Sequence, residues 1–150
     1  MRAATRDALV LKTVAEICDL QRRAAESEHA RADRARRTAA DRLEEGAAAV
    51  REAELGWMAA TARNMLDPTL SRAWLHALET RRVEERALDD AHLEATAEAD
   101  NRRAALGIAQ ARAQASHEQA RRAARAVTRR REEAELAAIE DRLNARRKVA

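Results

Sequence analysis

The sequence lacks most of the residues that interrupt helices or build compact cores. Its 150 residues include three glycines, one proline, two tryptophans and no Phe or Tyr. Few bulky side chains are therefore present to fill a globular core, so we expect no globular domain. The single cysteine, Cys18, cannot form an intramolecular disulfide, and neither a signal-peptide pattern nor a run of 18 apolar residues is present. These absences predict a cytoplasmic protein.

What the chain does contain is alanine and charge. There are 40 alanines, and 37% of the residues are charged, with 29 basic and 26 acidic side chains. This composition is typical of long helices and coiled coils. Disorder is the competing interpretation, but mixed-sign charge and high helix propensity favour helix. Replacing a leucine by alanine in a seam forfeits roughly 2 kcal/mol of burial, so we expect a thin contact between helices.

The only proline marks the only convincing turn. Asp67 is a good N-cap, and Pro68 suits the first helical position, where its missing N–H has no partner to lose. The residue before a proline is also pushed out of the helical region. We therefore predict a helix over about 7–64, a bend at 64–68 and a second helix over about 68–147. The predicted fold class is all-α, a single antiparallel coiled-coil hairpin over 1–150 with a longer C-terminal arm.

The first helix shows the periodicity of a coiled-coil seam. Small or apolar residues recur with alternating spacings of three and four, which indicates a period of 3.5. Two successive steps of four around Ala39 predict a stutter, where the supercoil unwinds locally. The predicted seam positions are Leu11, Val14, Cys18, Gln21, Ala25, Glu28, Ala32, Ala35, Ala39, Leu43, Gly46, Val50, Ala53, Trp57 and Ala60.

A fold-back at the bend predicts which residues face each other. With a turn near residues 65 and 66, the numbers of facing residues sum to about 131, which places Trp57 opposite Trp74. The acidic stretch 79–100 then lies near the basic stretch 22–37, and such charge pairs select register more than they add stability. The predicted pairs include Leu43 with Leu88, Ala25 with Leu106 and Glu28 with Arg103, so the seam should contain Leu43, Trp57, Trp74, Leu88 and Leu106.

No pattern in the sequence indicates catalysis. The histidines show no metal-binding spacing, the serines belong to no nucleophile motif, and no glycine-rich loop could hold a phosphate. We therefore expect no enzyme, no metal and no cofactor. Gly46, Gly56 and Gly107 stand alone in helical pattern, where they would permit close approach of helices. The histidines are His29, His76, His92 and His117.

Two stretches have the character of partner-binding surfaces. The C-terminal arm carries Leu136, Ile139 and Leu143 at helical spacing next to a run of arginines at 129–131, which is an amphipathic, basic helix. Intervening glutamates dilute the basic charge and no aromatic residues are placed for base stacking, so we expect no nucleic-acid partner. Near the bend, Met65, Leu66 and Leu70 are candidates for contact with a partner.

The length, the bend position, the unequal arms and the pattern Arg130-Arg131-Glu132-Glu133-Ala134-Glu135-Leu136-Ala137-Ala138-Ile139-Glu140-Asp141-Arg142 resemble the FliJ/SctO (YscO) family. These proteins are central stalks of flagellar and injectisome type III secretion. The resemblance implies a monomer without enzymatic activity that couples a hexameric secretion ATPase to the export gate in the membrane, with secretion chaperones as further partners. It would lie at the cytoplasmic face of the inner membrane.

The resemblance also implies roles for particular residues. The C-terminal arm would bind the ATPase, and the bend with the following part of the second helix would bind the gate or a chaperone. The implied ATPase-binding residues are Arg129, Arg130, Arg131, Leu136, Ile139 and Leu143. The implied gate-binding residues are Met65, Leu66, Leu70, Glu79, Glu84 and Glu85.

Two other interpretations make different predictions. A homodimeric structural coiled-coil scaffold would be an elongated dimer. A helical nucleic-acid-binding protein would show binding that weakens steeply with salt.

Overall fold

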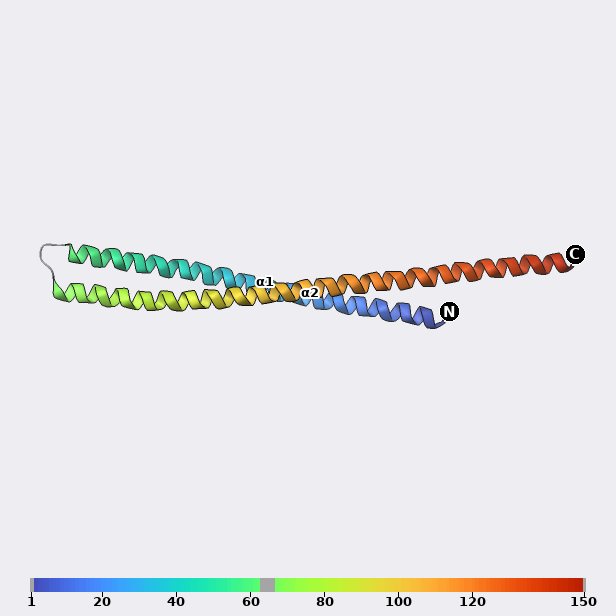
Figure 1. The fold of residues 1–150 in the computed structure, drawn as a ribbon, viewed down its shortest axis with the longest axis horizontal. Coiled ribbons are helices and arrows are strands. Elements are labelled where there is room, and N and C mark those ends of the chain that lie inside the picture. The colour runs from blue at the N-terminus through green and yellow to red at the C-terminus, as the bar shows by residue number, and fades with distance from the viewer. Residues whose placement is uncertain (1, 63–66, 150) are drawn as a thin grey trace. The chain divides into compact units, whose positions relative to one another are not determined.

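The computed structural model describes residues 2–62 and 67–149, with side chains for 3–62 and 67–144. Two helices account for nearly all of them: α1 spans Arg2–Thr61 (60 residues) and α2 spans Pro68–Val149 (82 residues), as Figure 1 shows. The described residues include no strand. The helices pack against each other, which confirms the all-α two-helix hairpin predicted from the sequence.

The ends of the helices differ from the predicted bounds at three of four positions. α1 begins at Arg2 rather than near residue 7, because no glycine or proline precedes it there to prevent helix. It ends at Thr61 rather than 64, where the Thr61 hydroxyl donates to the carbonyls of Trp57 and Met58 at 3.1 Å each. Residues 63–66, which include Met65 and Leu66, lie outside the described residues.

The second helix begins at Pro68, as the turn chemistry predicts, and continues to Val149 rather than 147. The Asp67 carboxylate caps its start by accepting the backbone N–H groups of Thr69 at 2.9 Å and Leu70 at 3.4 Å. Both N–H groups belong to the first turn of the helix, where no backbone carbonyl is available to them. Sequence and structure therefore agree on what starts α2.

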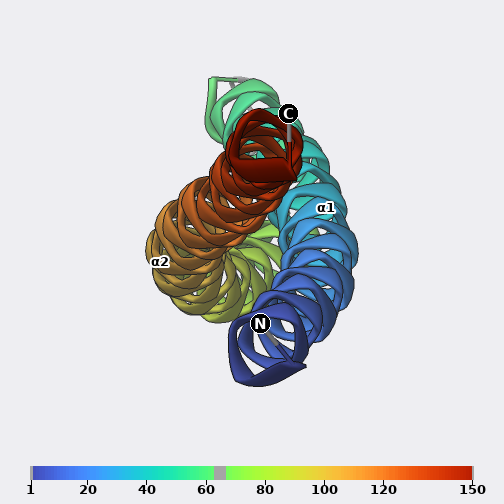
Figure 2. The ribbon, with the colours of Figure 1, turned by 90° about the vertical axis from the view of Figure 1, so that its right-hand side faces the viewer.

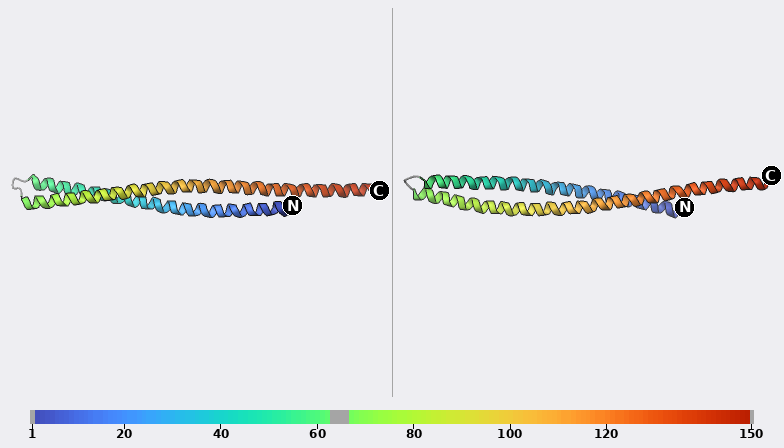
Figure 3. Two further views of the ribbon diagram at one scale, coloured as in Figure 1. Left: turned by 60° about the horizontal axis from the view of Figure 1, so that its bottom comes forward. Right: turned by 45° about the horizontal axis from the view of Figure 1, so that its top comes forward.

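The hairpin divides into two compact units. The middle unit comprises residues 27–104. Within it, Glu54 of α1 pairs with Arg82 of α2 at 2.9 Å, and Glu28 pairs with Arg102 at 2.7 Å, so later residues of α1 meet earlier residues of α2. This order makes the two segments antiparallel, and both views of Figure 3 show them side by side. The ion-pair partner of Glu28 is Arg102 rather than the predicted Arg103, so the prediction is wrong by one residue.

The terminal unit comprises residues 1–26 and 105–150. Its described segments are regular helices, as the blue start of α1 and the orange-to-red part of α2 show in Figure 2. Its best-covered side chains are small: Ala15 is 2% exposed and Ala113 is 3% exposed. Asp19 of α1 meets His117 of α2 at 2.7 Å. The most deeply buried side chains of this unit are therefore small, and a polar pair joins its two segments.

The covered face of α1 follows a regular heptad, and the stutter predicted around Ala39 is wrong. Ala15, rather than Val14, is the covered residue in the first turns, since Val14 is 41% exposed. The prediction failed because it took Val14 for the covered residue, and the next three heptads bury the polar Arg22, His29 and Arg36 partly, in place of the predicted Gln21, Glu28 and Ala35. The covered positions run Leu11, Ala15, Cys18, Arg22, Ala25, His29, Ala32, Arg36, Ala39, Leu43, Gly46, Val50 and Ala53, with steps of three and four throughout.

The largest buried side chains lie in the middle unit. Val50 at 7% exposure, Ala53 at 5% and Leu78 at 5% form its apolar cluster. Of the residues expected in the seam, Leu43, Trp74, Leu88 and Leu106 are half-buried, whereas Trp57 is 37% exposed.

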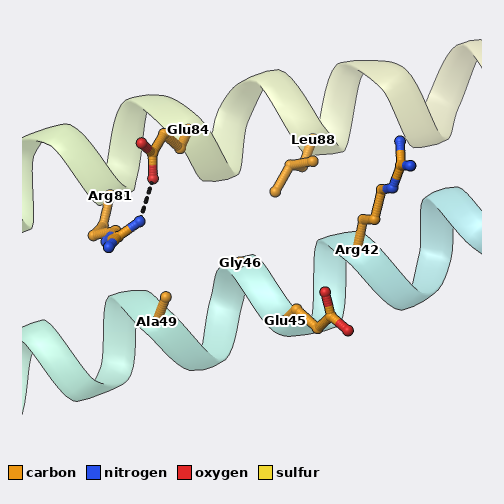
Figure 4. Close-up of a pocket in the computed structure, with 7 residues that line it drawn as sticks. All are labelled: Arg42, Glu45, Gly46, Ala49, Arg81, Glu84 and Leu88. Atoms are coloured by element: carbon orange, nitrogen blue, oxygen red, sulfur yellow. Dashed lines mark hydrogen bonds and ion pairs between the residues drawn. The ribbon is translucent and has the colours of Figure 1, made fainter.

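Two of the three glycines allow close helix contact. A Cβ at Gly46 would lie 2.6 Å from the Leu88 Cδ1 atom, and Figure 4 shows the Leu88 side chain directed at this glycine. A Cβ at Gly56 would lie 2.5 to 2.8 Å from three ring carbons of Trp74. Gly107 has open space around it, so the expected close approach there is wrong. Gly46 and Gly56 each make room for one large side chain of α2.

Candidate partner-binding site

The C-terminal part of α2 continues as a helix whose described side chains are not covered by α1. Among the described side chains of α2, Val127 is the last that is not exposed, and every side chain from residue 128 to 144 is exposed. We call residues 128–144 the extension. Its arginines at 129–131 stand together, ahead of an apolar stripe in which Leu136 is 61% exposed, Ile139 51% and Leu143 54%.

The apolar stripe of the extension does not continue the hairpin seam. Heptad spacing carries the covered positions of α2 from Ala120, Ala123 and Val127 on to residues 130, 134 and 137. Leu136 and Ile139 lie two residues beyond 134 and 137, which is about 200° around the helix. The extension therefore presents its large apolar side chains on the face opposite to the seam.

Sequence reasoning missed a second exposed apolar surface, at the start of α1. Five large aliphatic side chains within twelve residues are 41% to 63% exposed. The signal was present in the sequence, because residues 10, 13, 17, 20 and 24 repeat the three-and-four spacing on another face. It was overlooked because Val14 had been placed in the seam. The five side chains are Leu9, Val10, Val14, Ile17 and Leu20.

The residues expected to contact a gate or chaperone are mostly accessible. Leu70 is 45% exposed, and Glu79 and Glu84 are exposed, while Glu85 is half-buried. Glu84 accepts a hydrogen bond from Arg81 at 2.8 Å, beside the groove drawn in Figure 4. Met65 and Leu66 lie outside the described residues.

One polar pair in the terminal unit shifts an acid's pKa. The His117 ring Nε2 lies 2.7 Å from the Asp19 Oδ2 atom, and the Arg22 Nε lies 3.5 Å from the Oδ1 atom. The hydrogen bond from His117, with a smaller contribution from Arg22, lowers the pKa of Asp19 below its ordinary value of 3.8. The charged form of Asp19 is therefore favoured in the folded chain.

This shift predicts a loss of stability in acid. A carboxyl whose pKa is lowered by folding contributes stability above its unfolded pKa, and the contribution disappears as pH falls through the lower folded pKa. We expect the wild-type unfolding temperature to fall more steeply below about pH 4 than that of Asp19→Asn. Circular dichroism melts from about pH 6 to about pH 2 would measure both slopes. Equal slopes would show that the pair contributes nothing.

The described residues show neither a metal-binding cluster nor a membrane-spanning helix. They contain no group of three or more His, Cys, Asp or Glu side chains placed to hold a metal ion. No helix among them is long and apolar enough to cross a membrane.

The described residues form an antiparallel two-helix hairpin with an exposed helical extension and an exposed apolar face on α1. Comparison with models of known protein families, with curated proteins and with solved structures finds no match to this chain.

Proposed function

We propose that this chain is a central stalk and escort protein of flagellar or injectisome type III secretion, which couples a hexameric secretion ATPase to the export gate. The observation that carries the proposal is the extension: a helix that continues beyond the packed region and is exposed from residue 128 to 144. The resemblance to the FliJ/SctO family names the partners, and the extension supplies a surface that suits one of them.

The extension has the chemistry of a docking segment for a protein ring. Leu136, Ile139 and Leu143 give an apolar stripe that a groove between ATPase subunits could cover, and burial of each would contribute about 1.5 to 3 kcal/mol. The exposed arginines at 129–131 would guide the helix toward acidic residues and set its orientation. Because the helix continues into the two-helix hairpin, movement of the ring would be passed to a stiff element.

The gate-binding role is proposed for the residues near the bend. Leu70, Glu79 and Glu84 are accessible, and Met65, Leu66 and Glu85 complete the proposed set. Carboxylates around a few apolar side chains suit a basic surface on the gate or on a secretion chaperone. The chain itself would hydrolyse nothing, since its proposed role is coupling.

Binding of purified chain to a hexameric secretion ATPase tests the proposal. We expect Leu136→Asp with Leu143→Asp to leave helicity unchanged, because both side chains are exposed, and to weaken binding more than about 100-fold. Ala134→Asp with Ala137→Asp adds the same charge to another face of the same helix and should bind far better. Full affinity of the leucine variant would remove the extension from the proposed site.

A homodimeric structural scaffold is the alternative function. It predicts no affinity for the ATPase in any variant. Failure of the wild-type chain to bind ATPases of both flagellar and injectisome systems would favour it over the stalk.

A further inference from the structure

The start of α1 exposes more large apolar side chains than its contact with α2 buries. Leu9, Val10, Ile17 and Leu20 are 49% to 63% exposed, and Val14 is 41% exposed. The contact with α2 in the same stretch is made largely by alanines such as Ala15 and Ala113. Leu9 lines a groove against α2, whereas Val10, Ile17 and Leu20 share another face of α1. An exposed apolar face of this kind marks an interaction site.

Val10, Ile17 and Leu20 belong to a second coiled-coil stripe on α1. The covered positions Ala8, Leu11 and Ala15 are each followed two residues later by a stripe position, Val10, Thr13 and Ile17. Two residues correspond to about 200° of helix rotation, so the stripe lies opposite the seam. It continues through Leu20 and Ala24 with the three-and-four spacing that is typical of coiled-coil interfaces. The occupant that fits such a stripe is another helix.

We propose that this stripe is an interface with a second copy of the chain, in which the two α1 helices pack antiparallel across a two-fold axis. When facing residue numbers sum to 37, Ile17 packs against Leu20 of the other copy and Thr13 against its Ala24, and each contact occurs twice. Every large residue near the centre of the stripe then meets an apolar partner. Each hairpin keeps its own α1–α2 contact, because the stripe and the seam lie on opposite faces.

Charge complementarity favours a second copy in this orientation. Glu16 and Arg23 flank the stripe on the same side of α1, and both are exposed. Their numbers sum to 39, so the antiparallel arrangement brings Glu16 of each copy near Arg23 of the other, giving two ion pairs. Among the described residues of one copy, Glu16 makes a long ion pair of 3.9 Å with Lys12. A parallel arrangement would place Glu16 beside the uncharged Val14 and Gln21 instead.

The self-association departs from the monomer that the family resemblance implies, and it does not depend on the proposed role in secretion. It uses residues 10–24 of α1, whereas the proposed ATPase contact uses residues 129–143 of α2. The dimer interface can therefore be tested on the chain alone, and the result does not depend on ATPase binding.

Solution mass as a function of concentration tests the interface. We expect sedimentation equilibrium of the full chain, from about 1 to about 200 µM, to show a reversible change from 16.7 kDa to twice that mass. Ile17→Asp with Leu20→Asp should raise the dimer dissociation constant more than about 100-fold. Leu136→Asp with Leu143→Asp is the matched control, with two equally exposed aliphatic residues replaced elsewhere, and should dimerise like wild type.

Charge reversal tests the orientation. Glu16→Arg and Arg23→Glu should each weaken dimerisation about fivefold to tenfold, because each replaces two attractions by two repulsions. An equal mixture of the two variants should associate as tightly as wild type, since both ion pairs re-form in the mixed dimer. In a parallel dimer the mixture would gain nothing over either variant.

Three results would overturn the proposal. The first is a 16.7 kDa mass at every concentration. The second is a dimer that survives Ile17→Asp with Leu20→Asp but disappears in the Leu136 and Leu143 control. The third is a monomer whose stripe variant loses ATPase binding, which would assign the stripe to that partner. Circular dichroism of every variant confirms that helicity is retained, so loss of the dimer is not loss of the fold.

Discussion

Replacing Leu78 by alanine is expected to lower the free energy of unfolding by about 2 to 4 kcal/mol. Leu78 is 5% exposed and packs with Val50 and Ala53 in the apolar cluster of the middle unit. In a chain so rich in alanine, few other large side chains are available to fill the space that the substitution leaves. Urea unfolding followed by circular dichroism at 222 nm would measure the loss.

Leu75→Ala provides the matched control for this prediction. Leu75 lies less than one turn before Leu78 on α2 but is 44% exposed. The same atoms are removed and the same helix propensity is gained, so the two variants differ only in burial. We expect Leu75→Ala to change stability by less than about 1 kcal/mol. A similar loss in both variants would show that the apolar cluster does not hold the helices together.

The second large effect is expected at Gly56. Alanine there would place a Cβ 2.5 to 2.8 Å from three carbons of the rigid Trp74 ring, so the ring must turn away or the helices must separate. Overpacking of this kind costs about 1 to 3 kcal/mol, which exceeds the helix-propensity gain of up to about 1 kcal/mol. In a Trp57→Phe background, Trp74 is the sole tryptophan, and we expect its emission to shift to longer wavelength.

Alanine substitutions at the other two glycines provide comparisons for the loss of stability expected at Gly56. At Gly46 the added Cβ would meet the flexible end of Leu88 at 2.6 Å, which can rotate aside, so the loss should be smaller. At Gly107 nothing lies within 4 Å, so alanine should stabilise the helix by up to about 1 kcal/mol. A rise in stability for all three substitutions would contradict the close helix contacts at positions 46 and 56.

The fold could be predicted because a few residues determine it. Asp67 and Pro68 specify one turn, and the near absence of other helix breakers leaves two long helices. The start of α2 at Pro68 follows from this chemistry alone. The register could be predicted only to within a few residues: Glu28 meets Arg102 rather than Arg103, because an alanine-rich seam has few large side chains to fix axial position.

The surfaces were harder to predict than the fold. The predicted seam contains Val14 instead of Ala15, since larger apolar residues are normally the buried ones. Here close packing of two helices favours the smaller side chain, and the larger residues remain outside. The extension was easier to anticipate, because its position follows from the unequal lengths of the two helices.

The polar residues in the seam of α1 have a consequence for which helices can pair. Arg22, His29 and Arg36 occupy one position in three successive heptads. If two α1 helices joined in parallel through this face, each of these residues would meet its own copy, and the arginine layers would repel. We therefore expect the seam of α1 to disfavour a parallel pairing with a second copy of itself.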